Sequence, residues 1–243
     1  MLIHSHPLFR IYFGDSKDEL FAKDYASLPK DKKIYELEQF SRLKKLIQVE
    51  TLIFLHQMHG AQGLVVDSME QAKKIKSFTI NGDYIVTNVK RVGIGVMTAD
   101  CLPIVFFDKR NQALGIAHAG WRGSAKQIAA KVIGSMQESF GSQVDDLMII
   151  IGPSAKVCCY KVSDSFIENI EDFEFLDRVL QRRSDGLYFD LPMFNVAILE
   201  ELGVKRESIQ LKYNDCTMCG QLFFSYRRDG KEGGRQMTVA CLT

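Results

Sequence analysis

Two apolar runs dominate the middle of the chain, within residues 92–126. The first run is rich in valine and isoleucine, the second is rich in alanine and glycine, and the polar residues 108–111 separate them. Apolar runs bounded by turn-forming residues are typical of buried strands, and a short polar break between two such runs is typical of a hairpin turn. The pattern therefore predicts an antiparallel strand pair at the centre of the fold.

A turn centred on residues 109–110 determines which residues of the two strands face each other. In this register Cys101 faces His118, and Phe107 faces Gln112. Facing residues in an antiparallel pair have β-carbons about 4.5–5.5 Å apart. A thiolate and an imidazole at that spacing can share one metal ion, since zinc lies about 2.3 Å from sulfur and about 2.0–2.1 Å from nitrogen. They can equally form a nucleophile–base pair, so the pattern leaves both interpretations open.

The same periodicities predict the remaining elements and one domain over residues 1–243. Apolar positions at helical spacing indicate a helix over residues 33–49, and Ser124 is the expected N-cap of a helix over residues 125–140. The almost wholly apolar stretch 147–151 predicts a strand buried on both faces. Further helices are expected at 163–169, 172–181 and 192–202, a charged connector at 70–78, and strands at 8–13, 51–55, 62–67, 83–87, 208–212 and 237–242.

Composition narrows the class of protein. The 243 residues are 46% hydrophobic and 25% charged, which is ordinary for a globular chain with a sizeable core. The net charge of +1 gives no general attraction to nucleic acid or to an anionic membrane surface, and no run approaches the roughly 18 apolar residues that span a bilayer. Six cysteines without a visible secretory signal are more typical of thiols or metal ligands than of disulfides, so we expect a cytoplasmic protein.

His59, in the motif HQMHG, joins Cys101 and His118 as a third candidate ligand. Two of the three residues end a predicted strand and one begins a strand, so the three can meet at one edge of a sheet. Two imidazoles and one thiolate leave a fourth position open, which is the composition of a catalytic zinc site. His56 is the weaker candidate, because it points to the opposite face of an extended chain. The alternative is that Cys101 is a buried small hydrophobe and His118 a hydrogen-bonded core residue.

Two segments that contain arginine are candidate anion sites. Arg122 lies in GWRGS at the expected start of a helix, where unpaired backbone N–H groups and the guanidinium both attract negative charge. Arg227 lies in FFSYRRDG, whose aromatic side chains can stack on a purine while the arginines hold phosphate or carboxylate. The alternative in each case is a solvated arginine with no ligand.

The pair Cys216 and Cys219 forms an isolated CxxC motif. These residues could join the adjacent Cys158 and Cys159 in a structural zinc site, but a single CxxC is a weak signal and the chain has no second one. The chain also lacks the nucleophile elbow, the phosphate-binding P-loop, the dinucleotide-binding glycine fingerprint and the H-x-E…P-C-x-x-C pattern of cytidine-type deaminases. The functions that depend on these motifs are therefore not expected.

Six ordered motifs carry a family resemblance over residues 51–243, namely HQMHG, GDYIVT, TADCLPIVFFD, GIAHAGWRG, IGPSAKVCCYKV and CTMCGQLFFSYRRDGKEGGRQ. They resemble the laccase-domain or polyphenol-oxidase-like family, whose members are understood as purine nucleoside phosphorylases. The resemblance implies zinc held by His59, Cys101 and His118. It also implies an α/β (α+β) fold, a single compact domain built on a mixed β-sandwich flanked by helices.

On this resemblance the expected substrates are phosphate and the nucleosides adenosine, inosine, guanosine and S-methyl-5′-thioadenosine, with adenosine deamination as a second activity. Zinc would activate water for attack on the purine C6, and zinc with Arg122 would hold phosphate for attack on the anomeric carbon. Asp83 and Asp100 are expected to contact substrate or transfer protons, and Arg227 to contact substrate. The usual F-S-T-R-x-G-G segment of the family is replaced by FGDSKD at residues 13–18, which lacks the arginine, so the preferred nucleoside is left open.

The histidine count separates the possible metal chemistries. A multicopper oxidase needs a trinuclear centre with many imidazoles, and only three histidines lie outside the N-terminal segment. We therefore expect no multicopper laccase activity and regard copper at a His₂Cys site as adventitious. Two other hypotheses stay open: a cysteine hydrolase with Cys101 as nucleophile and His118 as base, and a metal- or nucleoside-binding module without catalytic activity.

Overall fold

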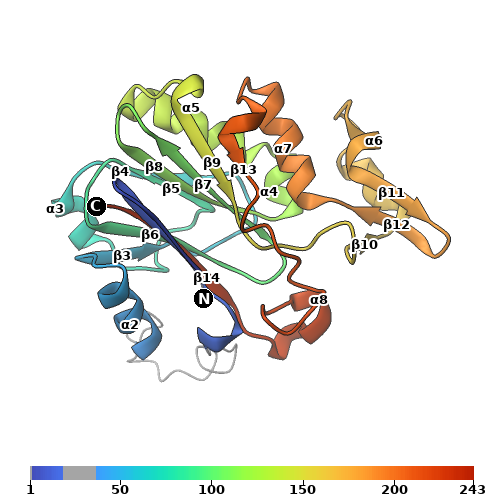
Figure 1. The fold of residues 1–243 in the computed structure, drawn as a ribbon, viewed down its shortest axis with the longest axis horizontal. Helices are drawn as coiled ribbons and strands as arrows, with labels where there is room; N and C mark the ends of the chain where they lie inside the picture. The colour runs from blue at the N-terminus through green and yellow to red at the C-terminus, as the bar shows by residue number, and fades with distance from the viewer. Residues whose placement is uncertain (1, 19–36) are drawn as a thin grey trace.

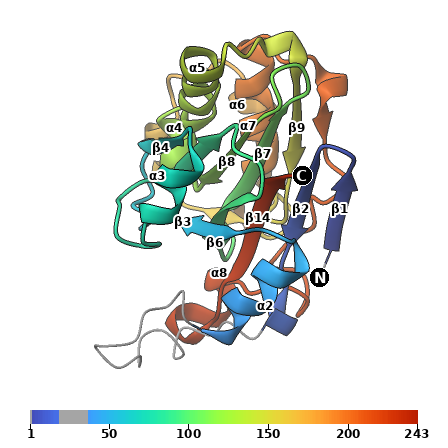
Figure 2. The same ribbon diagram turned by 90° about the vertical axis from the view of Figure 1, so that its left-hand side faces the viewer.

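The computed structural model describes residues 2–18 and 37–243 of the chain (Figure 1). Two large β-sheets pack face to face, and helices cover their outer faces. In Figure 2 the helices α5 (Ile128–Phe140) and α7 (Leu191–Glu201) lie in the upper part of the molecule, and α2 (Glu38–Leu46) lies in the lower part. The predicted fold class, a mixed β-sandwich flanked by helices, is confirmed.

Within the described residues the strands form three sheets. The five-stranded sheet has the order β1 (Leu2–His6), β2 (Phe9–Phe13), β14 (Gln236–Leu242), β6 (Val92–Thr98) and β3 (Thr51–Phe54). The six-stranded sheet has the order β13 (Ile209–Gln210), β9 (Leu147–Ile151), β7 (Leu102–Asp108), β8 (Ala113–Ala119), β5 (Tyr84–Thr87) and β4 (Gly63–Val66). A small sheet at the right of Figure 1 has the order β10 (Lys161–Val162), β12 (Gly186–Phe189) and β11 (Leu180–Arg183).

Both large sheets mix parallel and antiparallel pairs. β3 pairs with β6 in parallel, whereas the other pairs of the five-stranded sheet are antiparallel. In the six-stranded sheet β13 with β9 and β4 with β5 are parallel, and β5, β8, β7 and β9 are joined by antiparallel pairs. The central hairpin β7–β8 therefore lies inside a sheet, with strands on both sides.

Alternation along the central strands divides the core into layers. Val105 and Phe107 of β7 point between the two large sheets and pack with side chains of β2, β6 and β14. Ile104 and Phe106 of the same strand point the other way, toward α5 and α7. A third layer fills the space between the five-stranded sheet and α2. β9 is likewise covered on both faces, as its apolar sequence predicted.

The central hairpin forms, but in a register different from the predicted one. Phe107 lies opposite Leu114 and Pro103 lies opposite His118, so Cys101 does not directly face His118. The register differs by two residues, and because side chains alternate with a period of two, such a shift keeps each side chain on its predicted face. Cys101 and His118 therefore still belong to the same side of the hairpin.

The loop of the hairpin explains the shift. Asp108, the last residue of β7, accepts hydrogen bonds through its carboxylate from the backbone N–H groups of Arg110 and Asn111. Gln112 completes the loop with a positive φ of 49°. The loop therefore spans residues 109–112 and is longer than the predicted two-residue turn, because an aspartate side chain can organise the backbone that follows it.

The first apolar run contains two strands in place of one. β6 ends at Thr98 and β7 begins at Leu102, and the two strands belong to different sheets. Between them Asp100 has a φ of +80°, a conformation that few residues other than glycine adopt. The chain thus crosses from one sheet to the other immediately before Cys101.

The helix predicted over residues 125–140 divides into two. Ser124 lies inside the short helix α4 (Trp121–Ala125) and caps no helix N-terminus. α5 begins after Gln127, which adopts a left-handed conformation with φ of 55°. Ser124 is buried, and its hydroxyl accepts a hydrogen bond from the Asn195 side chain of α7. This long-range contact, which no local pattern encodes, gives Ser124 a role different from the predicted cap.

Other differences occur where the local signal is weak. The predicted connector at 70–78 overlaps α3 (Met69–Lys74), and the helix predicted at 172–181 is reduced to α6 (Leu176–Val179), after which β11 begins. Residues 33–36 of the helix predicted over residues 33–49 lie outside the described residues. No helix in the described part of the chain is long and apolar enough to cross a membrane. The strands predicted at 8–13, 51–55, 62–67, 83–87, 147–151, 208–212 and 237–242 are present with small boundary changes.

Candidate metal centre

His59, Cys101 and His118 converge at the open end of the β7–β8 hairpin, opposite its loop. One donor atom from each side chain lies within 4.8 Å of the other two. The rings of His59 and His118 meet edge to face with centroids 4.7 Å apart. His118 is buried in β8, Cys101 is half-buried beside the sheet crossing, and His59 is exposed in the loop after β3. The structure thus brings together three candidate ligands from three separate segments.

Asp83 holds two of these ligands in place from the buried side. One carboxylate oxygen accepts hydrogen bonds from Nδ1 of His118 at 2.8 Å and from the backbone N–H of His59 at 3.0 Å. The other oxygen accepts from the backbone N–H groups of Met58 and Gly60. Burial raises the pKa of Asp83, but these hydrogen bonds outweigh it and hold the pKa below its ordinary value. Because Nδ1 of His118 is the donor to Asp83, Nε2 is left available to a metal.

Two glycines of GWRGS make the close packing of this centre possible. A β-carbon on Gly120 would lie 2.9 Å from Sγ of Cys101, and one on Gly123 would lie 2.8 Å from the carbonyl oxygen of Gly60. Both distances are shorter than van der Waals contact, so larger residues would displace the sulfur or the loop that carries His59. The glycine-rich character of this motif therefore reflects close approach of the backbone.

Cys101 and His118 shift each other's pKa in opposite directions. Burial disfavours both charged forms, but the attraction between the two charges and the hydrogen bond that joins them outweigh it. These interactions lower the Cys101 pKa to about 6, with a smaller contribution from His59, and raise the His118 pKa to about 9, with a contribution from Asp83. A metal ion needs the thiolate and the neutral imidazole, so its binding would release the proton that His118 holds.

Alkylation of Cys101 in the metal-free protein is expected to follow its low pKa. The thiolate is the reactive form, so the rate constant for iodoacetamide should rise with pH and reach half its maximum near pH 6, well below the ordinary value of 9.0. Peptide mapping by mass spectrometry measures the rate at each cysteine. Cys241 is the internal control, because burial raises its pKa to about 11 and it should stay unmodified. A midpoint near pH 9 for Cys101 would contradict the paired state.

The donor set of this centre fits a divalent transition metal. Two imidazole nitrogens and one thiolate form three corners of a tetrahedral site and leave one position for a ligand, as in catalytic zinc sites. The hydrogen bond from His118 to Asp83 is the support that metal-ligating histidines commonly have. Imidazole and thiolate sets also bind copper, so the identity of the metal stays a prediction.

The other three histidines make contacts elsewhere. His4 and His6 pack against aromatic side chains of the sandwich, and His56 hydrogen-bonds the side chain of Asn81 at 3.0 Å. Among the residues that the structure describes, no second histidine group lies near enough together to hold a metal. The expectation that this chain has no trinuclear copper centre stays a prediction.

Asp100 is engaged by the protein on both carboxylate oxygens. One oxygen accepts a hydrogen bond from the Thr217 hydroxyl at 2.7 Å. The other accepts from the Ser225 hydroxyl at 3.0 Å and from the backbone N–H of Arg227 at 2.7 Å. Asp100 thereby ties the turn that carries Cys101 to two C-terminal segments, and its predicted contact with substrate stays a prediction.

Arg122 presents an exposed guanidinium group shortly after His118 in the sequence. Its guanidinium carbon lies 4.3 Å from the centroid of the Trp121 ring, and Trp121 packs edge-on against Phe166. Among the described residues this guanidinium has no hydrogen-bond or ion-pair partner. It is therefore available to bind an anion, although α4 is too short to add a substantial helix dipole.

Tyr160 is a candidate site residue that sequence analysis missed. The guanidinium carbon of Arg227, in α8 (Tyr226–Asp229), lies 5.0 Å from the centroid of its ring. The charges of Arg227 and Cys101 both act on its hydroxyl, and burial, the largest influence, raises its pKa to about 12. The phenol therefore keeps its proton at neutral pH. A tyrosine that follows two cysteines does not by itself indicate a functional site. The only feature of the sequence that could have identified Tyr160 is its place in the family motif IGPSAKVCCYKV.

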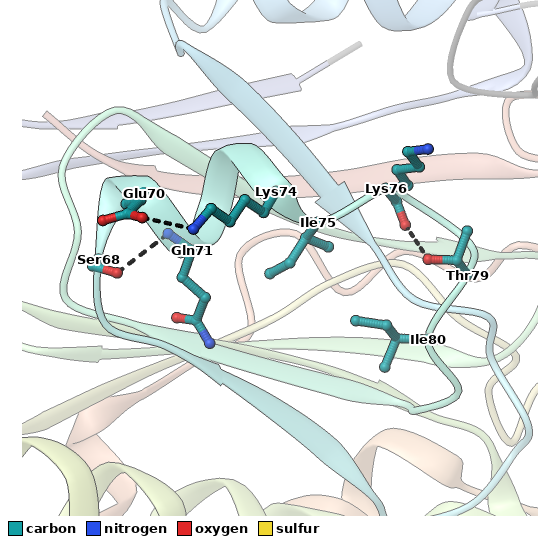
Figure 3. A pocket seen from close by; sticks show the side chains of 8 residues that line it. All are labelled: Ser68, Glu70, Gln71, Lys74, Ile75, Lys76, Thr79 and Ile80. Atoms are coloured by element: carbon teal, nitrogen blue, oxygen red, sulfur yellow. Dashed lines mark hydrogen bonds and ion pairs between the residues drawn. The ribbon is translucent and has the colours of Figure 1, made fainter.

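A pocket of about 490 Å³ lies between α3 and the loop that follows it (Figure 3). An ion pair between Lys74 and Glu70 crosses one side of it, and the Thr79 hydroxyl donates to the Lys76 carbonyl on the other. It contains none of the candidate metal ligands, so it is separate from the metal centre. Its lining residues are Ser68, Glu70, Gln71, Lys74, Ile75, Lys76, Thr79 and Ile80.

Three relatives are similar to this chain. A protein of Aquifex aeolicus named purine nucleoside phosphorylase is 42% identical over 150 residues, which are 62% of this chain and 66% of that protein. A protein of Geobacillus stearothermophilus named purine nucleoside phosphorylase YlmD is 32% identical over 196 residues, 78% of this chain and 71% of that protein. A protein of an unknown prokaryotic organism named adenosine deaminase RL5 is 33% identical over 199 residues, 79% of this chain and 75% of that protein.

The similarity extends to three dimensions. The crystal structure of YlmD from Geobacillus stearothermophilus superposes on this chain with a TM-score of 0.72 and 28% sequence identity, covering 84% of this chain and 78% of that chain. Residues 18–243 match one family model, and the matched segment contains every candidate site residue discussed above. This chain therefore belongs to the family described as multi-copper polyphenol oxidoreductase laccase.

Proposed function

We propose that this protein is a purine nucleoside phosphorylase with a second activity as an adenosine deaminase. The observation that carries the proposal is the cluster of His59, Cys101 and His118, supported by Asp83 and close in sequence to the exposed Arg122. Relatives named purine nucleoside phosphorylase and adenosine deaminase support the substrate class. The nucleosides in the proposal are adenosine, inosine, guanosine and S-methyl-5′-thioadenosine, and phosphate is the second substrate.

The two reactions break different bonds of the nucleoside. Phosphorolysis breaks the bond between the purine nitrogen and the anomeric carbon, forms a carbon–oxygen bond to phosphate, and leaves a proton on the purine. Deamination replaces the amino group at the purine C6 with oxygen from water and releases ammonia. Zinc held by His59, Cys101 and His118 would supply Lewis acidity and would lower the pKa of a coordinated water toward about 7.

The side chains around the cluster bind and orient the reactants. Arg122 and Arg227 offer guanidinium groups to phosphate oxygens, since the planar fork matches that geometry. Tyr160 keeps its phenolic proton at neutral pH and offers a hydrogen-bond donor. We assign Asp83 and Asp100 a positioning role, because protein donors bind both oxygens of each carboxylate, and their contact with substrate stays a prediction.

A cytoplasmic location, one domain over residues 1–243 and adventitious copper belong to the same proposal. None of the six cysteines forms a disulfide bond, which fits the reducing cytoplasm. The two large sheets share one core, which supports a single domain. Copper would bind to the same three ligands as zinc. Among the described residues no second group of histidines lies near enough together to hold the further copper ions of an oxidase.

A nucleoside panel assayed with and without phosphate tests the proposal. The zinc content of the protein is measured first, and free base, ribose phosphate and inosine are then separated by chromatography. We expect release of free base from each nucleoside only when phosphate is present, and conversion of adenosine to inosine without phosphate. A zinc-loaded protein that releases no free base from any of the four nucleosides would refute the phosphorylase and favour a binding module.

Replacing Arg122 with glutamine is expected to separate the two activities. A hydrogen bond to a charged group contributes about 1.5–3 kcal/mol, so kcat/KM for phosphate should fall about 10- to 150-fold. Deamination uses water in place of phosphate and should change little. Arg110→Gln is the matched control, since Arg110 lies in the hairpin loop with its side chain 73% exposed. Equal losses in both activities would contradict a phosphate-binding role for Arg122.

A cysteine hydrolase is the second candidate, and one observation favours it. Cys101, His118 and Asp83 are connected in the order of nucleophile, base and orienting acid. The two candidates differ in the effect of zinc, which should protect Cys101 from alkylation in a metal centre. Rapid alkylation of Cys101 in zinc-loaded protein, together with hydrolysis of model esters, would favour the hydrolase.

A further inference from the structure

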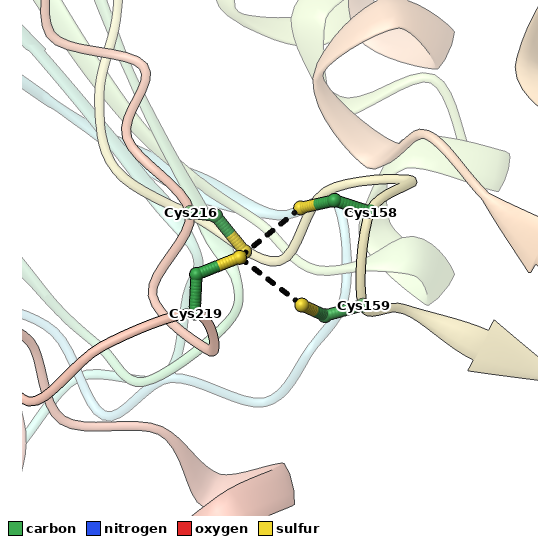
Figure 4. Close-up of side chains that lie close together, drawn as sticks. All are labelled: Cys158, Cys159, Cys216 and Cys219. Carbon is green, nitrogen blue, oxygen red and sulfur yellow. Dashed lines mark hydrogen bonds between the residues drawn. The ribbon is translucent and has the colours of Figure 1, made fainter.

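Four cysteines outside the metal centre converge from two distant segments. Cys158 and Cys159 lie in the loop between β9 and β10, and Cys216 and Cys219 lie in the loop between β13 and α8. All four sulfur atoms lie within 4.8 Å of one another. Figure 4 shows the four side chains pointing toward one place from two facing loops. We call this group the four-cysteine cluster.

The spacing of the sulfur atoms suits four thiolates around one metal ion. Four sulfurs at about 2.3 Å from zinc form a tetrahedron with edges of about 3.8 Å. Sγ of Cys219 lies 3.4 Å from Sγ of Cys158 and 3.1 Å from Sγ of Cys159, and no pair is more than 4.8 Å apart. The two measured sulfur–sulfur distances are slightly shorter than this tetrahedral edge, and the upper limit is longer than it. Both measured distances are far longer than the sulfur–sulfur bond of a disulfide, which is about 2.05 Å.

Backbone hydrogen bonds hold both cysteine loops in this arrangement. The carbonyl of Ser154 accepts a hydrogen bond from the N–H of Thr217 at 3.0 Å, which joins the two loops through a parallel β-bridge. The N–H of Cys159 donates to the carbonyl of Lys156 and closes a turn. On a turn, unlike an extended strand, neighbouring side chains can point the same way, so Cys158 and Cys159 both reach the cluster.

Two cationic side chains lie beside the cluster. Four thiolates around a divalent metal ion carry an excess of negative charge, which cationic groups and N–H donors stabilise. Nζ of Lys156 donates at 2.8 Å to a carbonyl of the opposite loop, and the Arg183 guanidinium donates at 3.2 Å to the carbonyl of Cys158.

We propose that Cys158, Cys159, Cys216 and Cys219 form a structural zinc site, separate from the metal centre of the proposed function. Four protein thiolates leave no position for a substrate, which is the composition of a closed structural site. Thiolate sets of tetrahedral geometry select zinc or iron among the common metals. Cys158 and Cys219 are exposed, so a metal ion can enter from solvent.

The two loops that this zinc site joins both bind Asp100. The N–H of Ala155 donates to the main-chain carbonyl of Asp100 at 2.9 Å, and the Thr217 hydroxyl donates to its carboxylate at 2.7 Å. Asp100 directly precedes Cys101 and adopts a left-handed conformation that the surrounding contacts must maintain. The structural zinc therefore joins the two loops that bind Asp100 and thereby hold the turn before Cys101 in its conformation.

Zinc counting on the full-length protein tests this site. Wild-type protein and variants are purified from zinc-supplemented cells in reducing buffer, and zinc and iron per chain are measured by mass spectrometry. Wild-type protein should hold two zinc ions per chain, and Cys101→Ala and Cys219→Ser should each hold one. Cys241→Ala is the matched control, because Cys241 is buried outside both clusters, and it should hold two.

X-ray absorption on Cys101→Ala gives a second readout that leaves the four cysteines intact. The remaining zinc should have only sulfur neighbours, at about 2.3 Å. This result does not depend on whether the protein acts on nucleosides, so failure of the phosphorylase proposal and failure of the zinc site are distinguishable. The proposal would be overturned if the wild-type protein held one zinc ion and Cys101→Ala held none. It would also be overturned by nitrogen neighbours around the remaining zinc, by iron in place of that zinc, or by a disulfide among these four cysteines in freshly purified protein.

Discussion

Cys101→Ala is expected to lose the metal of the centre and with it both nucleoside activities. Cys101 supplies the only thiolate of the cluster with His59 and His118. A catalytic metal stabilises the transition state by several kcal/mol, so kcat/KM should fall by at least about 10³-fold, which corresponds to about 4 kcal/mol. The loss of one zinc ion per chain and the loss of activity are measured on the same preparation.

Cys241→Ala is the matched control for this substitution as well. Cys241 is 2% exposed in β14 and belongs to the core layer beneath α2. Its replacement removes buried packing and should lower the thermal midpoint while zinc and activity are retained. A fully active Cys101→Ala protein would show that the reaction does not need the cluster, and both the metal and the hydrolase interpretations would then be wrong.

Asp83→Asn is expected to weaken metal binding without removing any ligand. The amide nitrogen of asparagine accepts no hydrogen bond, so donors among His118, His59, Met58 and Gly60 lose a partner. Loss of a hydrogen-bond partner behind a metal-ligating histidine typically weakens metal affinity about 10- to 100-fold. The dissociation constant for zinc, measured by competition with a chelator, should rise by that factor. The buried donors left unpaired should also lower the free energy of unfolding by about 1–3 kcal/mol.

Asp145→Asn controls for the change of charge in Asp83→Asn. Asp145 forms a surface ion pair with Lys205, and its side chain is 73% exposed, so zinc affinity should not change. If Asp83→Asn binds zinc as tightly as the wild-type protein, the orientation of His118 does not depend on the carboxylate. The positioning role assigned to Asp83 would then be wrong.

Two of the candidate metal ligands could be predicted from sequence because they lie on one hairpin. Apolar alternation assigns Cys101 and His118 to the same face, and the error of two residues in the register leaves that assignment unchanged. His59 was a candidate from its place after a predicted strand, and the motif resemblance chose it over His56, but its loop conformation with a φ of 56° is one that no periodicity predicts. Local pattern was therefore sufficient for the strands and insufficient for the loop.

The role of Asp83 depends on how two separate strands pair. β5 runs antiparallel to β8 with Tyr84 opposite Ala117, which places Asp83 beside His118. The backbone N–H of His118 then donates to the carbonyl of Asp83 at 2.7 Å, and its ring donates to the carboxylate. Sequence alone indicated an acidic residue at the start of a predicted strand and could not distinguish a substrate contact from a buried acceptor.

The sequence by itself determined the main strands, the face that each side chain takes, the fold class and the candidate metal ligands. These features depend on hydrophobic alternation and on motifs that are contiguous along the chain. Only the tertiary structure decided the hairpin register, the hydrogen bonds of Asp83 and Asp100, and the meeting of the four cysteines. Cys158 and Cys219 are 61 residues apart, and the β-bridge that brings their loops together joins two segments with no shared local pattern. Periodicity reports which side of a segment is buried, whereas the identity of the segment that buries it is decided by the packing of the whole chain.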